Sequence, residues 1–286
     1  MSLLDTIRTT MVEFYTGSAP VGLTGCNRSY NNVQSNVPSI TSETTSPLPD
    51  ALITWPPSLS QELVAHDDAN WQKANWSNGQ PFNVSWQPDN IIFRDGLMIL
   101  QLDNEGCPAD CDGLPYASGE YRTIQEDFGQ GYYEARIMGS SGEGLNTSFF
   151  IYSGDSGSES HDEIDVVEIL GRNCEQVQTN YYVEGRGKHE LMINLDFNAC
   201  EEFHNYGLAW SEDTLIWYID GREVRRVAED LSTEAHELPY RPGKITVNFW
   251  AGIGVEAWLG NFAYPGHPME AQYDWLRFSS PSETAR

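Results

Sequence analysis

The chain has 286 residues, and its 42 acidic against 16 basic side chains give a formal net charge of -26. A surface this negative repels phosphate backbones and anionic membranes, so no nucleic-acid or membrane partner is expected and a neutral substrate or cationic ligand is favoured, although solubility alone explains the charge equally well. No run of about 18 apolar residues is present, which is the length that a membrane-spanning helix needs.

Residues 1–50 differ in composition from the rest of the chain. They are rich in Ser, Thr, Asn, Gly and Pro and show no apolar periodicity, which predicts an N-terminal extension followed by a single domain over residues 51–286. Asp5, Arg8 and Glu13 interrupt the apolar stretch that a secretory signal would need, so such a signal is absent or already removed. We nevertheless expect an extracellular, secreted protein.

From about residue 51, short aromatic and β-branched runs follow one another, separated by Gly, Asn, Asp and Pro. The runs are NIIFRDGLMILQLD, EYRTIQE, GYYEARIM, NTSFFIYSG, EIDVVEIL, QTNYYVEG, TLIWYIDGREVRRV, KITVNFWAG and YDWLRF. Many short strands at this spacing are typical of a β-sandwich or barrel, and the Asp220-Gly221 pair predicts a tight hairpin. No internal repeat and no long helical pattern accompanies them, so an all-β domain is predicted.

The alternation within these runs predicts one packed and one functional sheet face, because side chains at i and i+2 of a strand share a face. The pairs that share a face are Glu120 with Arg122, Phe150 with Tyr152, Glu163 with Asp165, Asn180 with Tyr182, and Asn248 with Trp250. The residues between them, such as Phe149, Ile151 and Val247, are mostly apolar. Aromatic rings beside polar groups suit a sugar chain. Ordinary core aromatics are the alternative, but buried charges such as Glu120 and Arg122 would then be costly unless paired.

The segment HDEIDVVEIL carries three acids within six positions, at Glu163, Asp165 and Glu168. In a regular strand Glu168 would point into the packed face, so we predict a β-bulge around Val166-Val167 that returns it to the face of the other two. Two glutamates could then flank one glycosidic bond, as in retaining glycosidases, whose carboxyl groups lie about 5–5.5 Å apart. Asp165 between them would help to separate their pKa values. An acidic edge strand or a cation site is the alternative.

The five cysteines, Cys26, Cys107, Cys111, Cys174 and Cys200, are an odd number, so at least one is unpaired within the chain. Cys107 and Cys111 could form a metal pair, but no matching His or Cys cluster lies nearby in the sequence. A loop disulfide between them is therefore expected instead.

The acidic segment resembles the ExDxxE signature of glycoside hydrolase family sixteen, and the likeness runs from about Trp71 to Phe278. It rests on WQKANWSNGQPFNVSW, SGEYRT, GYYEARI, SFFIYSG, DEID, NYY, HNYGLAW, WYIDG, AWLG and YDWLRF, and it is most similar to the bacterial lichenases, which are endo-β-1,3-1,4-glucanases. The resemblance implies an all-β jelly-roll sandwich (concanavalin A-like) of two curved antiparallel sheets with a concave substrate cleft. Glu163 would be the nucleophile, Glu168 the acid/base and Asp165 the assisting carboxylate.

The resemblance also implies a set of cleft residues and a structural metal. The implied substrate-binding residues are Asn78, Glu120, Arg122, Phe150, Tyr152, Asn180, Tyr182, Asn248, Trp250 and Trp258. His161 is added to them because it lies beside Asp162 and Glu163, although a lone histidine is more often a hydrogen-bonding neighbour than a catalytic group. A structural Ca²⁺ on the convex side would use Asp274 and the backbone of Gly96, whereas catalysis itself would need no cofactor. The implied protein is a monomeric endo-acting retaining glucanase that cleaves mixed-linkage β-1,3-1,4-glucan and also β-1,3-glucan.

Some features differ from the lichenase pattern and keep two alternatives open. Lichenases usually have ExDxE, whereas the longer ExDxxE form is typical of the laminarinase and galactan branches. His161 stands where lichenases tend to have Trp, and HDEID resembles the xyloglucan endotransglycosylases, so a glucan or xyloglucan transglycosylase is one alternative. The lichenase disulfide is missing, because Val84 and Ser118 occupy its positions. A non-catalytic carbohydrate-binding jelly roll is the other alternative, against which the complete set of three acids argues.

Overall fold

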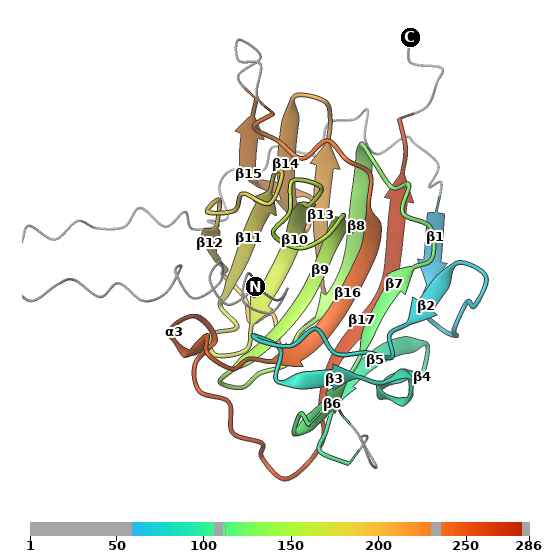
Figure 1. The fold of residues 1–286 in the computed structure, drawn as a ribbon, viewed down its shortest axis with the longest axis vertical. Helices are drawn as coiled ribbons and strands as arrows, with labels where there is room; N and C mark the ends of the chain where they lie inside the picture. Colours follow the sequence, from blue (N-terminus) through green and yellow to red (C-terminus); the bar gives the residue numbers. More distant parts are fainter. Residues whose placement is uncertain (1–58, 106–110, 112, 230–235, 282–286) are drawn as a thin grey trace, which may run out of the picture.

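The computed structural model describes residues 59–105, 111, 113–229 and 236–281, which form two antiparallel sheets packed face to face (Figure 1). The eight-stranded sheet contains, in order, β15 (Arg222–Ala228), β14 (Thr214–Ile219), β13 (His204–Trp210), β8 (Gly131–Met138), β17 (Met269–Ser279), β5 (Leu97–Leu102) and β4 (Ile91–Arg94), with β1 (Leu59–Glu62) also paired to β17. The seven-stranded sheet contains β12 (Leu191–Asn194), β11 (Gln176–Tyr182), β10 (Asp162–Leu170), β9 (Leu145–Ser153), β16 (Lys244–Ala251), β7 (Glu120–Thr123) and β2 (Trp71–Lys73). The predicted all-β jelly-roll sandwich is confirmed, while the predicted extension over residues 1–50 lies outside the described residues.

The smaller elements lie around the lower end of the sandwich in Figure 1, at the lower left and beside β4 and β5. They are the parallel pair β3 (Val84–Trp86) and β6 (Tyr116–Ser118), the 3₁₀ turn η1 (Pro88–Asn90) and the single-turn helix α3 (Glu256–Leu259). Helices are so short in the described part of the chain that none could cross a membrane.

The predicted alternation of packed and functional faces is confirmed in the seven-stranded sheet. Phe149, Ile151, Ile164, Val247 and Phe249 are at most 2% exposed and belong to the core between the two sheets. Their strand neighbours at odd spacing point to the other, concave face. Burial of one complete face drives the sandwich together, because each buried aliphatic or aromatic side chain contributes about 1.5–3 kcal/mol.

Two tight turns require residues that tolerate a positive φ. Asp220 and Gly221 have φ of 49° and 74° and connect β14 to β15, so the predicted hairpin is confirmed. Asp95 and Gly96, with φ of 56° and 83°, connect β4 to β5 in the same way. Both central residues of such a turn adopt the left-handed region, which Asp and Gly reach at low cost.

Strand β13 was not among the predicted runs, because its sequence HNYGLAW begins with polar residues and has a glycine at its centre. Glycine weakens a strand unless another group approaches closely. Such an approach occurs here, since a Cβ at Gly207 would lie 2.6 Å from the Tyr132 hydroxyl. The short strands β1, β2, β3, β6 and β12, of three or four residues each, were missed because they are too short to show a period.

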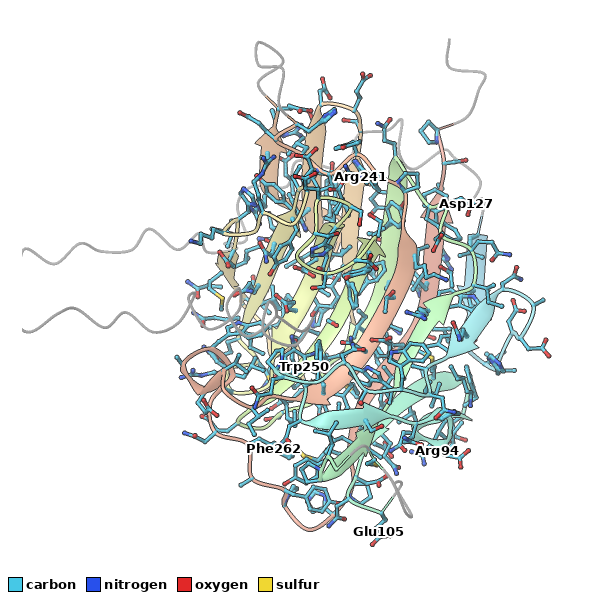
Figure 2. All side chains as sticks on the ribbon, in the orientation of Figure 1. Arg94, Glu105, Asp127, Arg241, Trp250 and Phe262 are labelled. Atoms are coloured by element: carbon cyan, nitrogen blue, oxygen red, sulfur yellow. A yellow bond between two sulfur atoms is a disulfide. The ribbon has the colours of Figure 1, made fainter. Side chains whose placement is uncertain are left out.

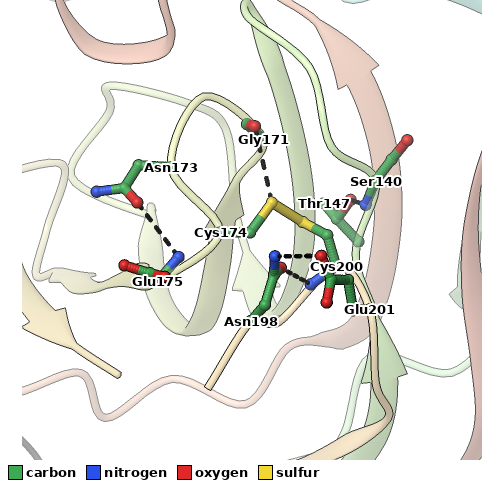
Figure 3. The surroundings of a disulfide bond; sticks show 9 residues. All are labelled: Ser140, Thr147, Gly171, Asn173, Cys174, Glu175, Asn198, Cys200 and Glu201. Carbon is green, nitrogen blue, oxygen red and sulfur yellow. Dashed lines mark hydrogen bonds between the residues drawn. A yellow bond between two sulfur atoms is a disulfide. The ribbon is translucent and has the colours of Figure 1, made fainter. Parts of the chain in front are cut away.

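A disulfide joins Cys174 to Cys200, with 5.7 Å between the Cα atoms (Figure 3). Cys174 lies in the connection between β10 and β11, and Cys200 in the connection that leads from β12 to β13 in the other sheet. The bond therefore fixes the turn after the acidic strand to the crossover between sheets. Cys107, and with it the predicted loop disulfide to Cys111, lies outside the described residues.

Candidate active site

Each of the three acids of β10 lies in its own row of side chains across the concave face. In register, Glu163 lies beside Tyr182 and Tyr152; Asp165 lies beside Asn180 and Phe150, followed by Thr246 and Arg122; Glu168 lies beside Gln178 and Ser148, followed by Asn248 and Glu120. The pairs predicted from alternation thus occupy one face.

The predicted bulge is present in β10. Asp165 is opposite Phe150 of β9 but Val167 is opposite Phe149, so Val166 is the extra residue. On the other side the register changes between Asp165 and Glu168 as well. A bulge lets two residues of one strand oppose one residue of its partner, and here it returns Glu168 to the face of Glu163 and Asp165.

The acids form part of the floor of a pocket on the concave face. The residues that line it are Pro81, Phe82, Ser148, Phe150, Ser156, Gly157, His161, Glu163, Asp165, Glu168, Gln178, Asn180, Tyr182, Gly185, Glu190, Asn248, Trp250, Val255 and Trp258. In Figure 2, Trp250 marks the end of β16 at this pocket, and Arg241 precedes the start of the same strand. Trp250 and Trp258 lie with their ring centroids 6.0 Å apart, so aromatic surfaces border the carboxylates.

The pKa values of Glu163 and Asp165 are shifted by burial, by neighbouring charge and by a hydrogen bond between the two side chains. Burial, and then the charge of Glu168, raises the pKa of Glu163 to about 8, while a hydrogen bond from Asp165 opposes the rise. Burial and the charge of Glu163 raise the pKa of Asp165 well above its usual value. Asp165 therefore keeps its proton and donates a hydrogen bond to Glu163, which lowers the pKa of Glu163 below the value that burial alone would give.

The raised pKa of Glu163 predicts a pH-dependent stability. Between pH 4.5 and about 8 the unfolded chain releases a proton at this residue that the folded chain retains, so the free energy of unfolding falls as the pH rises. Glu163→Gln removes this contribution. Its thermal midpoint is expected to lie above that of the wild type at pH 8 and to approach it at pH 4, as measured by calorimetry. An equal difference at both pH values would contradict the assignment.

Glu168 is held by two amide donors. Nδ2 of Asn146 donates to Oε1 at 3.0 Å and Nε2 of Gln178 donates to Oε2 at 2.8 Å. Burial, followed by the charge of Asp165, raises the pKa of Glu168 well above its usual value, and the two amides only partly oppose this. The side chain is thereby both oriented and kept protonated, which are the requirements for a general acid.

His161 contacts the carboxylate of Glu163 directly. Its Nε2 lies 2.8 Å from Oε2 of Glu163, and its Nδ1 accepts the backbone N–H of Gly157 at 3.3 Å. Burial lowers the pKa of His161 to about 4, so the ring is neutral at working pH and the Gly157 bond assigns its proton to Nε2. His161 therefore donates a hydrogen bond to Glu163. Its contact with sugar stays a prediction.

Removing the donor is expected to raise the pKa of Glu163. His161→Phe keeps a ring between Tyr152 and Tyr182, which lie 4.9 and 5.2 Å away, but a charge-assisted hydrogen bond of about 1.5–3 kcal/mol is lost. We expect kcat/KM on the acidic limb of its pH profile to fall by about 10- to 100-fold and the limb to move to higher pH. His161→Gln, which keeps a donor, is the control. An unmoved limb with a raised KM would instead indicate a sugar contact alone.

Four predicted substrate-binding residues do not line this pocket. Glu120 is buried and accepts a hydrogen bond from Nδ2 of Asn248 at 3.2 Å, and burial raises its pKa to about 7. Arg122 stacks on Trp76 at 4.1 Å, while Tyr152 packs on His161 and Asn78 lies in the loop before β3. Glu120 thus supports Asn248, and contact of these four residues with substrate stays a prediction.

Other lining residues were missing from the predicted set. Gln178 and Ser148 continue the alternation of Asn180 and Phe150, so the same i and i+2 rule could have found them. Glu190 and Phe82 lie outside regular strands, where no period signals a direction. Their place at the pocket depends on the tertiary fold.

The residues implied for calcium are close in the fold but differently engaged. Gly96 lies in the β4–β5 turn, and Tyr273, the residue before Asp274, is opposite Met98 of β5. However, Nη1 of Arg136 donates to Oδ2 of Asp274 at 2.5 Å, so a guanidinium already neutralises this carboxylate. No group of three or more His, Cys, Asp or Glu side chains suited to a metal occurs in the described ranges. These residues do not fit a cation site while Arg136 holds this position.

A two-sheet sandwich whose concave pocket presents two glutamates and an aspartate on one bulged strand defines a glycoside hydrolase. The chain belongs to the glycosyl hydrolases family 16, whose sequence pattern it matches over residues 78–277.

Relatives and solved structures of this family are similar over most of the chain. A β-glucanase of Acetivibrio thermocellus is 42% identical over 213 residues, which are 74% of this chain and 59% of that protein, so the match leaves about two fifths of the relative's length uncovered. A β-glucanase of Bacillus subtilis is 38% identical over 78% of this chain and 86% of its own length. The crystal structure of a β-1,3-1,4-glucanase (lichenase) derived from a mouse hindgut metagenome superposes with a TM-score of 0.68 at 37% identity, covering 78% of this chain and 99% of the lichenase. The predicted family is confirmed.

Proposed function

We propose that this protein is an endo-acting, retaining β-glucanase that cleaves mixed-linkage β-1,3-1,4-glucan, and also β-1,3-glucan, by double displacement. The observation that carries the proposal is the common face of Glu163, Asp165 and Glu168 in β10, produced by the bulge at Val166. The names of the relatives, β-glucanase and lichenase, support the choice of substrate.

Each acid has one role in the proposed reaction. Glu163 attacks the anomeric carbon while Glu168 protonates the departing glycosidic oxygen, which gives a covalent glycosyl-enzyme. Glu168, now ionised, takes a proton from water, which displaces Glu163 with retention of configuration. Hydrogen bonds from His161 and Asp165 stabilise the charge on Glu163 before the attack and after its release. Two carboxyl groups complete this cycle, so the reaction needs no cofactor.

The shape of the cleft supports cleavage within a chain. A second hollow adjoins the pocket and shares Gln178, Glu190 and Trp258 with it. It continues over Arg172, Gln176, Lys188 and Met192, so a polysaccharide can extend past the acids. Ring faces at Phe150, Tyr182 and Trp258 suit stacking on pyranose rings, and the neighbouring amides suit sugar hydroxyls.

The test is to offer barley mixed-linkage glucan, laminarin, xyloglucan and agarose in parallel and to follow product size and anomeric configuration by NMR. We expect intermediate-length oligosaccharides from barley glucan, with the β-anomer formed first. Inverted products would overturn the mechanism, and activity on agarose alone would overturn the substrate. A xyloglucan oligosaccharide added as acceptor distinguishes the alternative, transglycosylation, because its products would then be longer than the donor fragments.

Location and oligomeric state are part of the proposal. The Cys174–Cys200 disulfide supports an extracellular protein, because such bonds persist in oxidising compartments. The exposed large hydrophobic side chains in the described ranges, Val64, Ile124, Tyr240 and Ile253, are too few for the apolar patch of an obligate oligomer, which supports a monomer that binds polysaccharide.

We propose that Arg136 takes the place of calcium at Asp274. Chelation with EDTA is therefore expected to leave the thermal midpoint of the wild type within about 2 °C, because binding to the folded state alone raises stability and no such binding is lost. The thermal midpoint of Arg136→Met, measured with and without added calcium, is the comparison. A midpoint that falls on chelation of the wild type and recovers with calcium would refute this replacement.

A further inference from the structure

Two side chains of the eight-stranded sheet reach the bulge of the acidic strand from behind. Trp217 of β14 is 1% exposed, and its Nε1–H donates to the backbone oxygen of Asp165 at 3.0 Å. Asp165 is the residue immediately before Val166, the extra residue of the bulge. Trp217 therefore contacts the acidic strand at the point where its register changes.

Arg225 of β15 holds the neighbouring strand at the same level. Its Nη1 donates to the backbone oxygen and to Oγ1 of Thr179 at 3.0 and 2.9 Å. On β11, Thr179 lies between Asn180, which is opposite Asp165, and Gln178, which is opposite Glu168. The Arg225 guanidinium thus grips the stretch of β11 that faces the bulge.

The two side chains act as one unit. Arg225 is opposite Trp217 in the β14–β15 register, and its guanidinium carbon lies 4.5 Å from the indole centroid. Nη2 of Arg225 also donates to the backbone oxygen of His189 at 2.6 Å, just before the pocket residue Glu190. A change at either residue would loosen the other.

The bulge explains why polar groups occur here. An extra residue interrupts the hydrogen-bond ladder between neighbouring strands, and backbone carbonyls beside it need partners from elsewhere. Packing alone does not require a guanidinium at this place, and its desolvation is a cost: burial lowers the pKa of Arg225 to about 10. The two donors supply partners to strands β10 and β11 on either side of the irregularity.

We propose that Trp217 and Arg225 form a clamp that fixes the bulge and thereby sets the position of Glu168 relative to Glu163. They are positioning residues, since they touch the backbone of the acidic strand and its neighbour from the core side of the sheet. The proposal rests on the proposed function in one respect, the role of Glu168 as acid/base. Loss of the clamp should weaken the step in which Glu168 gives up its proton, since a displacement of about 1 Å can cost 10²-fold in rate.

The test compares Trp217→Phe with Trp210→Phe. Trp210 is a matched control, because it is 3% exposed, lies in the neighbouring strand β13, and donates from Nε1 to the backbone oxygen of Pro239 at the same distance of 3.0 Å. Each variant is assayed on barley glucan, whose departing oxygen needs a proton, and on a dinitrophenyl β-glycoside of a short glucan, whose leaving group needs none. Thermal midpoints are measured in parallel.

We expect Trp217→Phe to lose about 10- to 100-fold in kcat/KM on glucan and less than about threefold in kcat/KM on the dinitrophenyl glycoside, because kcat/KM reports the first step, in which only glucan needs a proton from Glu168. Trp210→Phe should keep the wild-type ratio of the two activities whatever its thermal midpoint. Arg225→Met should show the same selective loss as Trp217→Phe and serves if that variant does not fold. Parallel losses on both substrates, or a wild-type ratio in both clamp variants, would overturn the clamp. A wild type that is inactive on glucan but active on the dinitrophenyl glycoside would overturn the proposed substrate. The clamp would then be tested with a series of aryl glycosides whose leaving groups have rising pKa. The rate of Trp217→Phe is expected to fall more steeply with leaving-group pKa than the rate of the wild type.

Discussion

Glu163→Gln is expected to reduce glucan hydrolysis by about 10⁴-fold or more, the order seen when an enzyme loses its nucleophile. The amide is nearly the same size and can still accept hydrogen bonds from His161 and Asp165, so the affinity for glucan should remain close to that of the wild type. The two quantities are measured as initial rates on barley glucan and as binding by calorimetry.

Glu159→Gln is the matched control for this change. Glu159 lies in the loop before β10, is exposed and is absent from the pocket lining, so the same change of charge should leave the rate unchanged. Retained activity in Glu163→Gln would remove the nucleophile assignment. Loss of glucan binding together with loss of rate would show that Glu163 binds the substrate rather than acting as the nucleophile.

Glu168→Ala is expected to lower kcat/KM on glucan by about 10²- to 10⁴-fold, the usual contribution of a general acid. Hydrolysis of a dinitrophenyl β-glycoside should pass its first step at nearly the wild-type rate, because that leaving group departs without a proton. The glycosyl-enzyme should then accumulate as a burst, since no base remains to activate water. Stopped-flow absorbance of dinitrophenolate measures both phases.

Added azide distinguishes the two glutamates by the configuration of the product. In Glu168→Ala azide would displace Glu163 from the glycosyl-enzyme and give the β-glycosyl azide. In Glu163→Ala azide would attack the substrate itself and give the α-glycosyl azide. An α product from Glu168→Ala would show that the roles of the two residues are exchanged.

The acids and most of their neighbours could be predicted from the sequence because they obey a local rule. Alternation on β9, β10, β11 and β16 determines which side chains share a face, and burial of residues such as Phe149 and Val247 selects the core side. Even the bulge followed locally, since a regular strand would bury Glu168 in the core. Local rules of this kind act over two to six residues.

The features that escaped prediction depend on contacts between distant segments. Trp217 meets Asp165 across 52 residues, and Arg225 meets Thr179 across 46, so nothing in either strand's own sequence signals the contact. The pairing of Cys174 with Cys200 and of Arg136 with Asp274 is equally non-local. The bond from His161 to Glu163, two residues away, is local by contrast, but its direction depends on the loop amide of Gly157 that bonds the other ring nitrogen.

The bulge at Val166 has a consequence for how this active site tolerates changes in chain length. Deleting a residue from a strand normally inverts every side chain beyond the deletion, which makes such losses among the most damaging in a β-protein. Here the strand already carries one residue more than its neighbours. Its removal would restore an unbroken pleat with Glu163, Asp165 and the second glutamate at every second position, all still on one side. The catalytic strand can therefore exist in two lengths with the same chemistry, and gain or loss of a single codon is a natural route between them.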